Sequence, residues 1–324
     1  MKKFFFYAFA VMTAVCMAAC SSDDDNSNKT NNSVDISAPA YADQAARYTL
    51  EKPKAPANAD VDAPQLKTID ITESGELLME FYQSVSKTTV YVKEKAVISG
   101  NTYTMNGTKV KGIIKVVEQA ARATRSGDTQ LTVDVAVKFS ALQTYTYTTE
   151  DGEIIHVTKG VPPSGDDAMA ILARTWNVLG LILDLKGPDV KAFETWESTG
   201  GVFDLETTLL KAALEREVSL TDEEQDALKK KVKNVAFTKT KLFCISYTDN
   251  TEDVASWDWT DASKTAIRIT LKDEKMGNKF IEDASLITFA FNGDRCNMKL
   301  VTNFTDSSNK NWDATVTLQL QSPK

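Results

Sequence analysis

Apolar and polar residues alternate along most of the chain after residue 66. The clearest runs lie at 131–139, 267–271 and 312–320, where every second residue is apolar. Strict alternation places one face of an extended segment in a core and the other face in water, as in the antiparallel strands of a sandwich or barrel. Further strands are expected at 77–83, 88–93, 102–105, 109–117, 143–149, 153–158, 236–247, 285–291 and 296–303. The pattern therefore predicts a mostly β protein.

Turn and helix signals interrupt this alternation. The expected strands are separated by Asn106-Gly107, Asp151-Gly152, Gly277-Asn278 and Asn292-Gly293. Between about residues 204 and 234 the apolar spacing becomes helical, and Thr221-Asp222-Glu223-Glu224 forms a capping box. A shorter helix is expected at 166–173. The sequence thus predicts antiparallel β units with a short helical insert.

The stretch before the first predicted strand has a different composition. Residues 21–65 are rich in Asn, Ser, Asp, Lys, Ala and Pro, and they contain no glycine. Such a segment buries too little apolar area to offset the entropy lost on ordering. We therefore expect a disordered spacer within residues 20–65, a first β unit at 66–160 and a second at 161–324.

The chain begins with MKKFFFYAFAVMTAVCMAAC. Lys2 and Lys3 precede an apolar run from Phe4 to Ala19, which is shorter than the about 20 apolar residues that a membrane-spanning helix needs. This arrangement predicts a removable export signal at residues 1–19.

The residues around the end of this run match known lipoprotein signals. Met17-Ala18-Ala19-Cys20 resembles the lipobox of bacterial lipoproteins, which implies cleavage before Cys20 and a lipid on its sulfur. An ordinary signal peptide with an incidental thiol is the alternative. The next residues resemble the acidic export signal of Bacteroidetes-type surface lipoproteins, which implies the cell surface, with a periplasm-facing outer-membrane anchor as the alternative. These residues are Ser21, Ser22, Asp23, Asp24 and Asp25.

Two further similarities concern the β units. Residues 71–78 (ITESGELL) resemble 237–243 (FTKTKLF), as two related units would produce. Residues 172–178 (LARTWNV) resemble the Gly-x-Trp opening of lipocalin-like domains, with Arg174 in place of glycine, and 237–238, 247–250 and 257–259 resemble lipocalin-like domains of Bacteroidetes-type lipoproteins. The resemblance covers roughly 165–322, and weakly 66–158. It implies an antiparallel barrel around an apolar interior, and with it the binding of a small ligand.

Charge and motif content exclude several functions. Loss of residues 1–19 changes the formal net charge from −8 to −10, which argues against nucleic acid and against direct adhesion to anionic lipid headgroups. There is no Gly-x-Ser-x-Gly, P-loop or dinucleotide fingerprint. His156 is the single histidine, so a His-rich zinc site is excluded. We expect His156 at an exposed position of a strand. We assign no catalytic, cofactor-binding or metal residue, while a pair of acidic hydrolase residues stays open.

The tryptophans and the remaining cysteines each have two interpretations. Trp257 and Trp259 share one strand face, which suits either a sugar-stacking platform or a barrel core. We favour the core and expect Trp176, Trp257 and Trp312 inside one barrel. Cys244 and Cys296 are compatible with a disulfide or with two separate buried thiols.

These observations lead to one main hypothesis and several alternatives. The main hypothesis is a surface-anchored, non-catalytic lipoprotein that binds a small hydrophobic or other small ligand. The alternatives are a structural or interaction module of an outer-membrane complex with a filled barrel, a carbohydrate-binding protein, and a hydrolase. The expected partners are the outer membrane through the lipid, a small ligand and an outer-membrane protein, with no nucleic acid.

Overall fold

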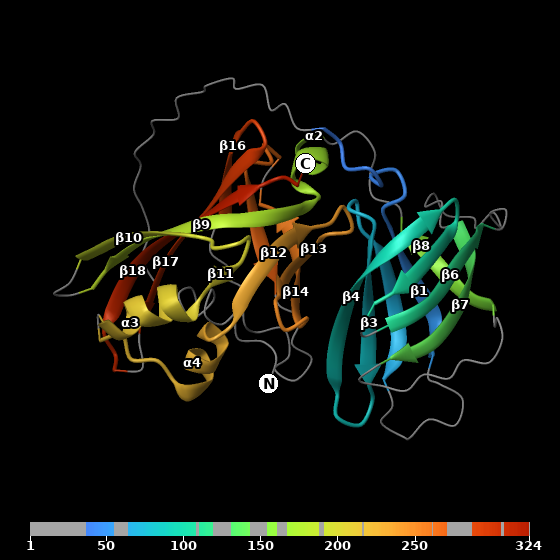
Figure 1. The fold of residues 1–324 in the computed structure, drawn as a ribbon, viewed down its shortest axis with the longest axis horizontal. Coiled ribbons are helices and arrows are strands. Elements are labelled where there is room, and N and C mark those ends of the chain that lie inside the picture. Colours follow the sequence, from blue (N-terminus) through green and yellow to red (C-terminus); the bar gives the residue numbers. More distant parts are fainter. Residues whose placement is uncertain are drawn as a thin grey trace. The chain divides into compact units, whose positions relative to one another are not determined.

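The computed structural model describes residues 37–54, 64–107, 110–118, 131–142, 154–160, 167–187, 191–215, 217–260, 262–270, 287–305 and 308–323. The chain divides into two compact units (Figure 1). The N-terminal unit comprises residues 38–174 together with 237–241, and the C-terminal unit comprises 175–236 and 242–324. Both units are built from antiparallel strands, so the prediction of a mostly β protein is confirmed.

The N-terminal unit is a closed barrel whose strands neighbour one another in sequence order. The ring closes where β1 pairs with β8, from Arg47 opposite Gly160 to Leu50 opposite Val157. The buried apolar residues lie mainly at inward positions of the strands, because one face of the closed sheet lines the interior. Its strands are β1 (Ala46–Lys54), β2 (Gln65–Ile71), β3 (Glu76–Gln83), β4 (Thr88–Ser99), β5 (Thr102–Asn106), β6 (Val110–Glu118), β7 (Leu131–Leu142) and β8 (Ile154–Gly160).

The strand β1 corrects the predicted spacer. Residues 46–54 pair with β2 on one side and β8 on the other, so the expectation of disorder up to residue 65 is wrong for this segment. Tyr48 and Leu50 are buried and alternate with more exposed Arg47 and Thr49. This short alternation stands among proline- and alanine-rich residues, which conceal it in the composition.

The C-terminal unit is a ten-stranded sheet that curls back on itself. An additional pairing between β9 and β12 closes eight of the strands into a ring and leaves β10 and β11 outside it. The strands are β9 (Thr175–Lys186), β10 (Lys191–Glu197), β11 (Phe203–Asp204), β12 (Lys231–Phe237), β13 (Leu242–Tyr247), β14 (Glu252–Trp259), β15 (Ala266–Thr270), β16 (Ile287–Asn292), β17 (Arg295–Thr305) and β18 (Asn311–Gln321).

One edge of β9 serves two partners. Its first residues, Thr175 to Asn177, pair with β12, whereas Gly180 to Lys186 pair with β10. The other edge of β9 pairs with β18. The ring is therefore closed by a ladder of three residue pairs.

Helices lie where the sequence predicts them. The insert between β11 and β12 contains the π-helix η1 (Glu206–Leu210), α3 (Lys211–Glu215) and α4 (Asp222–Leu228), and Leu205, Leu209 and Ala212 form the buried stripe. The insert ends sooner than expected, because β12 begins at Lys231. The short helix α2 (Asp167–Leu172) clusters with the N-terminal unit, so the unit boundary falls after Arg174 and not after residue 160.

The internal repeat suggested by the sequence has a structural counterpart. Each ring has eight strands, and the turn after β2 matches the turn after β12: Gly75 N donates to Thr72 O, and Lys241 N donates to Thr238 O, both at 3.0 Å. Gly75 and Lys241 both have positive φ, at 75° and 67°. The turn at 238–241 divides the predicted strand 236–247 in two, and the predicted strand 143–149 lies outside the described residues.

Candidate functional site

The strand register defines which side chains of the C-terminal ring face inward. Directly opposed residues of antiparallel strands project from the same face, and the buried residues follow that rule from strand to strand. The inward positions are Ala255, Trp257 and Trp259 on β14, Ile267 and Ile269 on β15, Ile287, Phe289 and Phe291 on β16, and Cys296, Met298 and Leu300 on β17.

Three of these inward residues are exceptional because they stay partly exposed. Trp259, Phe289 and Phe291 are half-buried, while the inward residues of β17 and β18 whose burial is described are buried. The half-buried rings lie near one end of the ring, since β14 ends at Trp259 and β16 ends at Asn292.

Aromatic contacts connect this end of the C-terminal ring. The ring centroids of Phe289 and Phe291 lie 6.1 Å apart in a stacked arrangement, and those of Phe291 and Trp176 lie 6.2 Å apart. Trp259 meets Trp257 edge-on at 5.2 Å. We call Trp176, Trp259, Phe289 and Phe291 the aromatic end. The sequence predicted a strand at 285–291 but attached no site to it; two phenylalanines at alternate positions were the available signal.

The predicted interior tryptophans are confirmed. Trp176, Trp257 and Trp312 are each at most 2 % exposed. The indole of Trp257 donates from Nε1 to the carbonyl oxygen of Leu242 at 3.1 Å, which satisfies its polar atom inside the core. A sugar-stacking platform needs an exposed ring face, so Trp257 does not form one.

Cys244 and Cys296 are free buried thiols in the structure. Of the two alternatives, the structure therefore shows separate thiols and not a disulfide. Cys296 faces inward on β17, whereas Cys244 opposes Val254, which lies on the outer face of β14. Side chains on opposite faces of a sheet cannot meet within bonding distance. Burial raises the pKa of the Cys296 thiol to about 12, which makes it unreactive at neutral pH.

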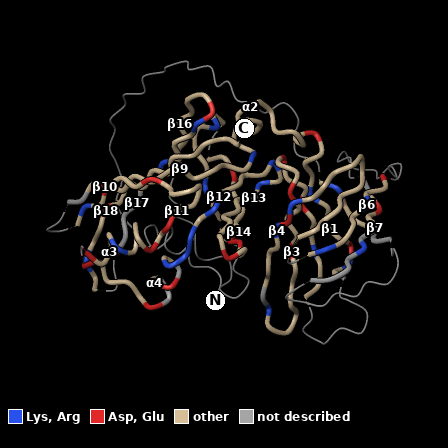
Figure 2. The backbone as a smooth tube through the Cα atoms, viewed as in Figure 1, with Lys and Arg blue, Asp and Glu red and all other residues tan. Residues whose placement is uncertain are grey.

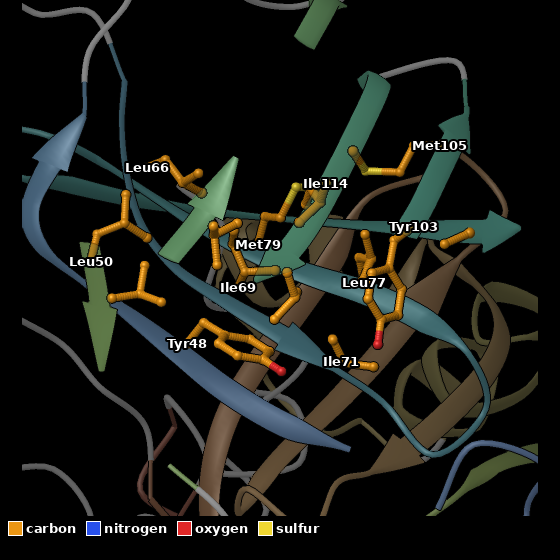
Figure 3. Close-up of a cluster of buried hydrophobic side chains, with 14 of the residues drawn as sticks. Tyr48, Leu50, Leu66, Ile69, Ile71, Leu77, Met79, Tyr103, Met105 and Ile114 are labelled. Carbon is orange, nitrogen blue, oxygen red and sulfur yellow. The ribbon is translucent and has the colours of Figure 1, made fainter. Parts of the chain in front are cut away.

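The interior of the N-terminal barrel is filled by its own side chains. Figure 3 shows Tyr48, Ile69, Met79 and Ile114 converging between the strands, and each of them is at most 3 % exposed. Close packing of this kind supplies stability through buried apolar area.

Polar groups occupy one end of that barrel. Lys159 Nζ lies 2.6 Å from Glu118 Oε1 and 5.9 Å from the centre of the Tyr48 ring. The hydroxyl of Tyr103 donates to Gln44 Oε1 at 3.4 Å. Burial raises the pKa of both Tyr48 and Tyr103 to about 12, so the two phenols stay protonated at physiological pH.

Two buried carboxyl groups form a second polar cluster within the N-terminal unit. Asp70 accepts from Arg47 Nε at 2.9 Å and from Thr240 Oγ1 at 2.7 Å, and Glu73 Oε1 accepts from the backbone N–H of Lys239 at 2.7 Å. Each carboxyl-bearing residue is 1 % exposed, and Glu73 Oε2 has no hydrogen-bond partner among the described residues. Burial raises the pKa of Glu73 to about 7, against the opposing effect of the Lys239 N–H. No sequence pattern marked this cluster.

A third polar group lies in the C-terminal unit. The Tyr247 hydroxyl donates to Asp253 Oδ2 at 2.6 Å, and Lys230 Nζ lies 3.6 Å from the same oxygen. Burial raises the pKa of Asp253, while Lys230 and the Tyr247 hydrogen bond lower it. Asp253 and Tyr247 are nearly inaccessible, so we assign this group a structural role.

The remaining predicted residues have mixed outcomes. His156 is exposed on β8 as expected, and its Nδ1 lies 2.6 Å from Asp134 Oδ1. Cys20 and the acidic segment 21–25 lie outside the described residues. Within the described ranges, no group of three or more His, Cys, Asp or Glu side chains is placed to hold a metal ion. None of the helices in those ranges is long and apolar enough to span a bilayer.

Comparisons with known proteins include distant structural likenesses, two of which are described here. No family model matches the chain, and no curated protein matches it. A protein of unknown function from the DUF3598 family of Nostoc punctiforme PCC 73102 aligns at 5 % identity and a TM-score of 0.20, covering 86 % of this chain and 94 % of that one. A mutant of the vaccine antigen transferrin binding protein B from Haemophilus parasuis Hp5 aligns at 9 % identity and a TM-score of 0.22, covering 86 % of this chain and 60 % of that one. Both TM-scores are below 0.5, so neither likeness supports a functional assignment.

Proposed function

We propose that this protein is a lipid-anchored, non-catalytic binding protein whose C-terminal barrel takes a small apolar ligand at the aromatic end. The observation that carries the proposal is the partial exposure of Trp259, Phe289 and Phe291 on the inward face of the ring. When an apolar molecule covers inward aromatic rings that water can still reach, apolar surface is removed from water, which favours binding.

The surroundings of the aromatic end favour an apolar ligand over a sugar. The neighbouring inward residues Ile267, Ile287 and Met298 are all apolar and buried. A sugar brings hydroxyl groups that each need a hydrogen-bond partner, and these side chains supply none. Trp257, the other half of the expected sugar platform, is only 2 % exposed.

The proposed location follows from the N-terminal sequence. A lipid on Cys20 anchors the mature chain in the outer membrane, and residues 21–25 direct it to the cell surface. Replacement of Cys20 by alanine removes the thiol that ends the lipobox-like segment, so metabolic labelling with palmitate should be lost and the protein should leave the membrane fraction. Persistent labelling of Cys20→Ala would contradict the anchor.

A second candidate function rests on the N-terminal barrel. Its interior is occupied by large side chains such as Phe81, Tyr103 and Met105, which suits an interaction module that displays its outer surface. The two functions are compatible, because each uses a different unit.

Mass spectrometry of an organic extract from natively purified protein tests the ligand. We expect one small apolar compound in near-equal molar amount with the protein, and its loss in Phe289→Ala and Phe291→Ala. The matched control is Val301→Ala, which truncates a 55 % exposed outward residue on the adjacent strand β17. Extracts without a bound compound, or equal retention in all three variants, would refute ligand binding at the aromatic end.

A further inference from the structure

The outer surface of the N-terminal barrel carries an exposed basic patch on three adjacent strands. Lys95 on β4 and Lys111 and Lys115 on β6 are exposed, and the strand β5 lies between them. Val97 opposes Thr104, which in turn opposes Ile113, so these three residues form a row across the strands. We call Lys95, Val97, Lys111, Ile113 and Lys115 the basic face.

The apolar members of the basic face are unusually open to water. Val97 is 66 % exposed and Ile113 is 42 % exposed, and Val117, further along the same side of β6, is 44 % exposed. Val97 and Ile113 share one row across the strands, with Thr104 between them, and Lys95, Lys111 and Lys115 lie in the rows on either side. Lysine stems cover such a strip while their ammonium groups reach outward.

Negative charge is scarce on this side of the barrel. No outward position on the described parts of β4, β5 and β6 is Asp or Glu, because Glu94 and Glu118 fall at inward positions of their strands. Two acidic residues border these strands. Glu76 on β3 opposes Lys95 and lies 3.5 Å from Lys93 Nζ, and Asp134 on β7 opposes Val117 and lies 2.6 Å from His156 Nδ1. Figure 2 shows acidic and basic positions interspersed along the rest of the described backbone. The negative net charge of the whole chain therefore does not reveal the local excess of lysine on the basic face.

An alternation of lysine with exposed apolar side chains fits a surface that is both anionic and apolar beneath its charged layer. A phospholipid bilayer has this order: phosphates bind the ammonium groups and the acyl boundary accepts the apolar side chains. The tether length is compatible with such contact, since residues 21–37 can span at most roughly 60 Å when fully extended. A barrel tethered within this distance meets the membrane at a high effective concentration.

We propose that the basic face docks on anionic phospholipid headgroups and so orients the anchored N-terminal barrel on the membrane. The inference extends the proposed function, and only its tether argument rests on the lipid at Cys20. It makes the membrane a direct contact of the barrel, in contrast to the expectation from net charge.

The test uses the mature chain, residues 21–324, produced without its signal segment so that it carries no lipid. Co-sedimentation compares vesicles of phosphatidylcholine with vesicles of phosphatidylcholine mixed with phosphatidylglycerol. We expect binding to the mixed vesicles only, weakened by added salt. Since a lysine at an anionic surface contributes roughly fivefold in affinity, the triple variant Lys95→Glu, Lys111→Glu and Lys115→Glu should lose at least about a hundredfold.

A matched control changes the same number of charges elsewhere. Lys233, Arg268 and Lys299 are exposed on strands of the C-terminal unit, and their replacement by glutamate should reduce binding far less. The double variant Val97→Ser and Ile113→Ser keeps the charge and should weaken binding several-fold. Circular dichroism establishes that each variant is folded.

Two outcomes would overturn the proposal. One is an equal loss of vesicle affinity in the basic-face variant and in the charge-matched control, which would show that binding depends on net charge alone. The other is absence of vesicle binding by the parent chain; capture of an acidic protein through the same lysines would then make the face a protein interface. Neither outcome bears on palmitate labelling of Cys20 or on extraction of a ligand, so the proposed function is tested separately.

Discussion

Trp312 and Gly187 provide a quantitative test of the packing between β18 and the end of β9. Trp312 is 2 % exposed, and a Cβ built on Gly187 would lie 2.6 Å from the Cζ3 atom of its indole. Gly187 does not have a positive φ, so alanine is acceptable to the backbone there and the effect of Gly187→Ala is steric. The expected cost is about 1–3 kcal/mol, the usual range for overpacking a core.

The partner substitution removes the atoms that cause the clash. The three atoms nearest to the added Cβ are Cζ3, Cε3 and Cη2, all in the six-membered ring of the indole. Trp312→Phe shortens the side chain at that place and leaves a cavity, whereas Trp312→Ala should cost about 3–5 kcal/mol. In the double variant of Gly187→Ala with Trp312→Phe, the alanine methyl fills part of the cavity. We therefore expect a favourable coupling of about 1–2 kcal/mol.

Urea denaturation followed by tryptophan fluorescence measures these effects. All five tryptophans lie in the C-terminal unit, so the signal follows the unfolding of that unit alone. Val301→Ala is the control, because Val301 is 55 % exposed on β17 of the same unit and its truncation should change stability by no more than about 0.5 kcal/mol. A neutral Gly187→Ala, or additive costs in the double variant, would refute the described packing of β18 against β9.

Three other predictions concern the tether, the barrel boundary and a buried acid. Replacing Asp23, Asp24 and Asp25 by alanine should keep the protein membrane-bound but protect it from external protease in whole cells; unchanged accessibility would make these residues a plain tether. Limited proteolysis, read by mass spectrometry, should leave a fragment that starts near residue 38, because β1 is part of the barrel, and a start near 66 would contradict its pairing. Burial raises the folded-state pKa of Glu73 from 4.5 to about 7. Ionisation of Glu73 therefore destabilises the folded state as the pH rises from about 4.5 to 7, and the free energy of unfolding falls by about 3 kcal/mol once ionisation is complete. Glu73→Gln keeps the acceptor for Lys239 and cannot ionise, so urea denaturation followed by circular dichroism should show equal stability at pH 4 and a more stable variant at pH 8; a pH-independent difference would refute the argument.

The sequence predicted the strands best where burial alone determines the pattern. β18 has one wet and one buried face along its whole length, so the alternation from Trp312 to Leu320 matches the structure. The turn at 238–241 was missed because it has no glycine or proline, and Lys241 adopts the positive φ that usually signals a turn through Gly. The local sequence does not indicate a positive φ at a lysine when the surrounding fold imposes that conformation.

The candidate site was harder to predict than the strands. Alternation identifies Phe289 and Phe291 as members of one face, but their partial exposure depends on where β15 begins and on what lies opposite them in the closed ring. The carboxyl cluster likewise joins Glu73 to Lys239, which are 166 positions apart in the sequence. Properties set by such distant neighbours have no local signature.

The divided edge of β9 has a consequence for how molecules reach the interior of the C-terminal ring. β9 and β12 share three residue pairs, whereas β17 and β18 share eleven. Separating β9 from β12 breaks far fewer backbone hydrogen bonds than separating β17 from β18, so the ring opens more readily between β9 and β12 than between β17 and β18. An apolar molecule that entered sideways between β9 and β12 would first meet Trp176, which pairs with Val235 across this ladder.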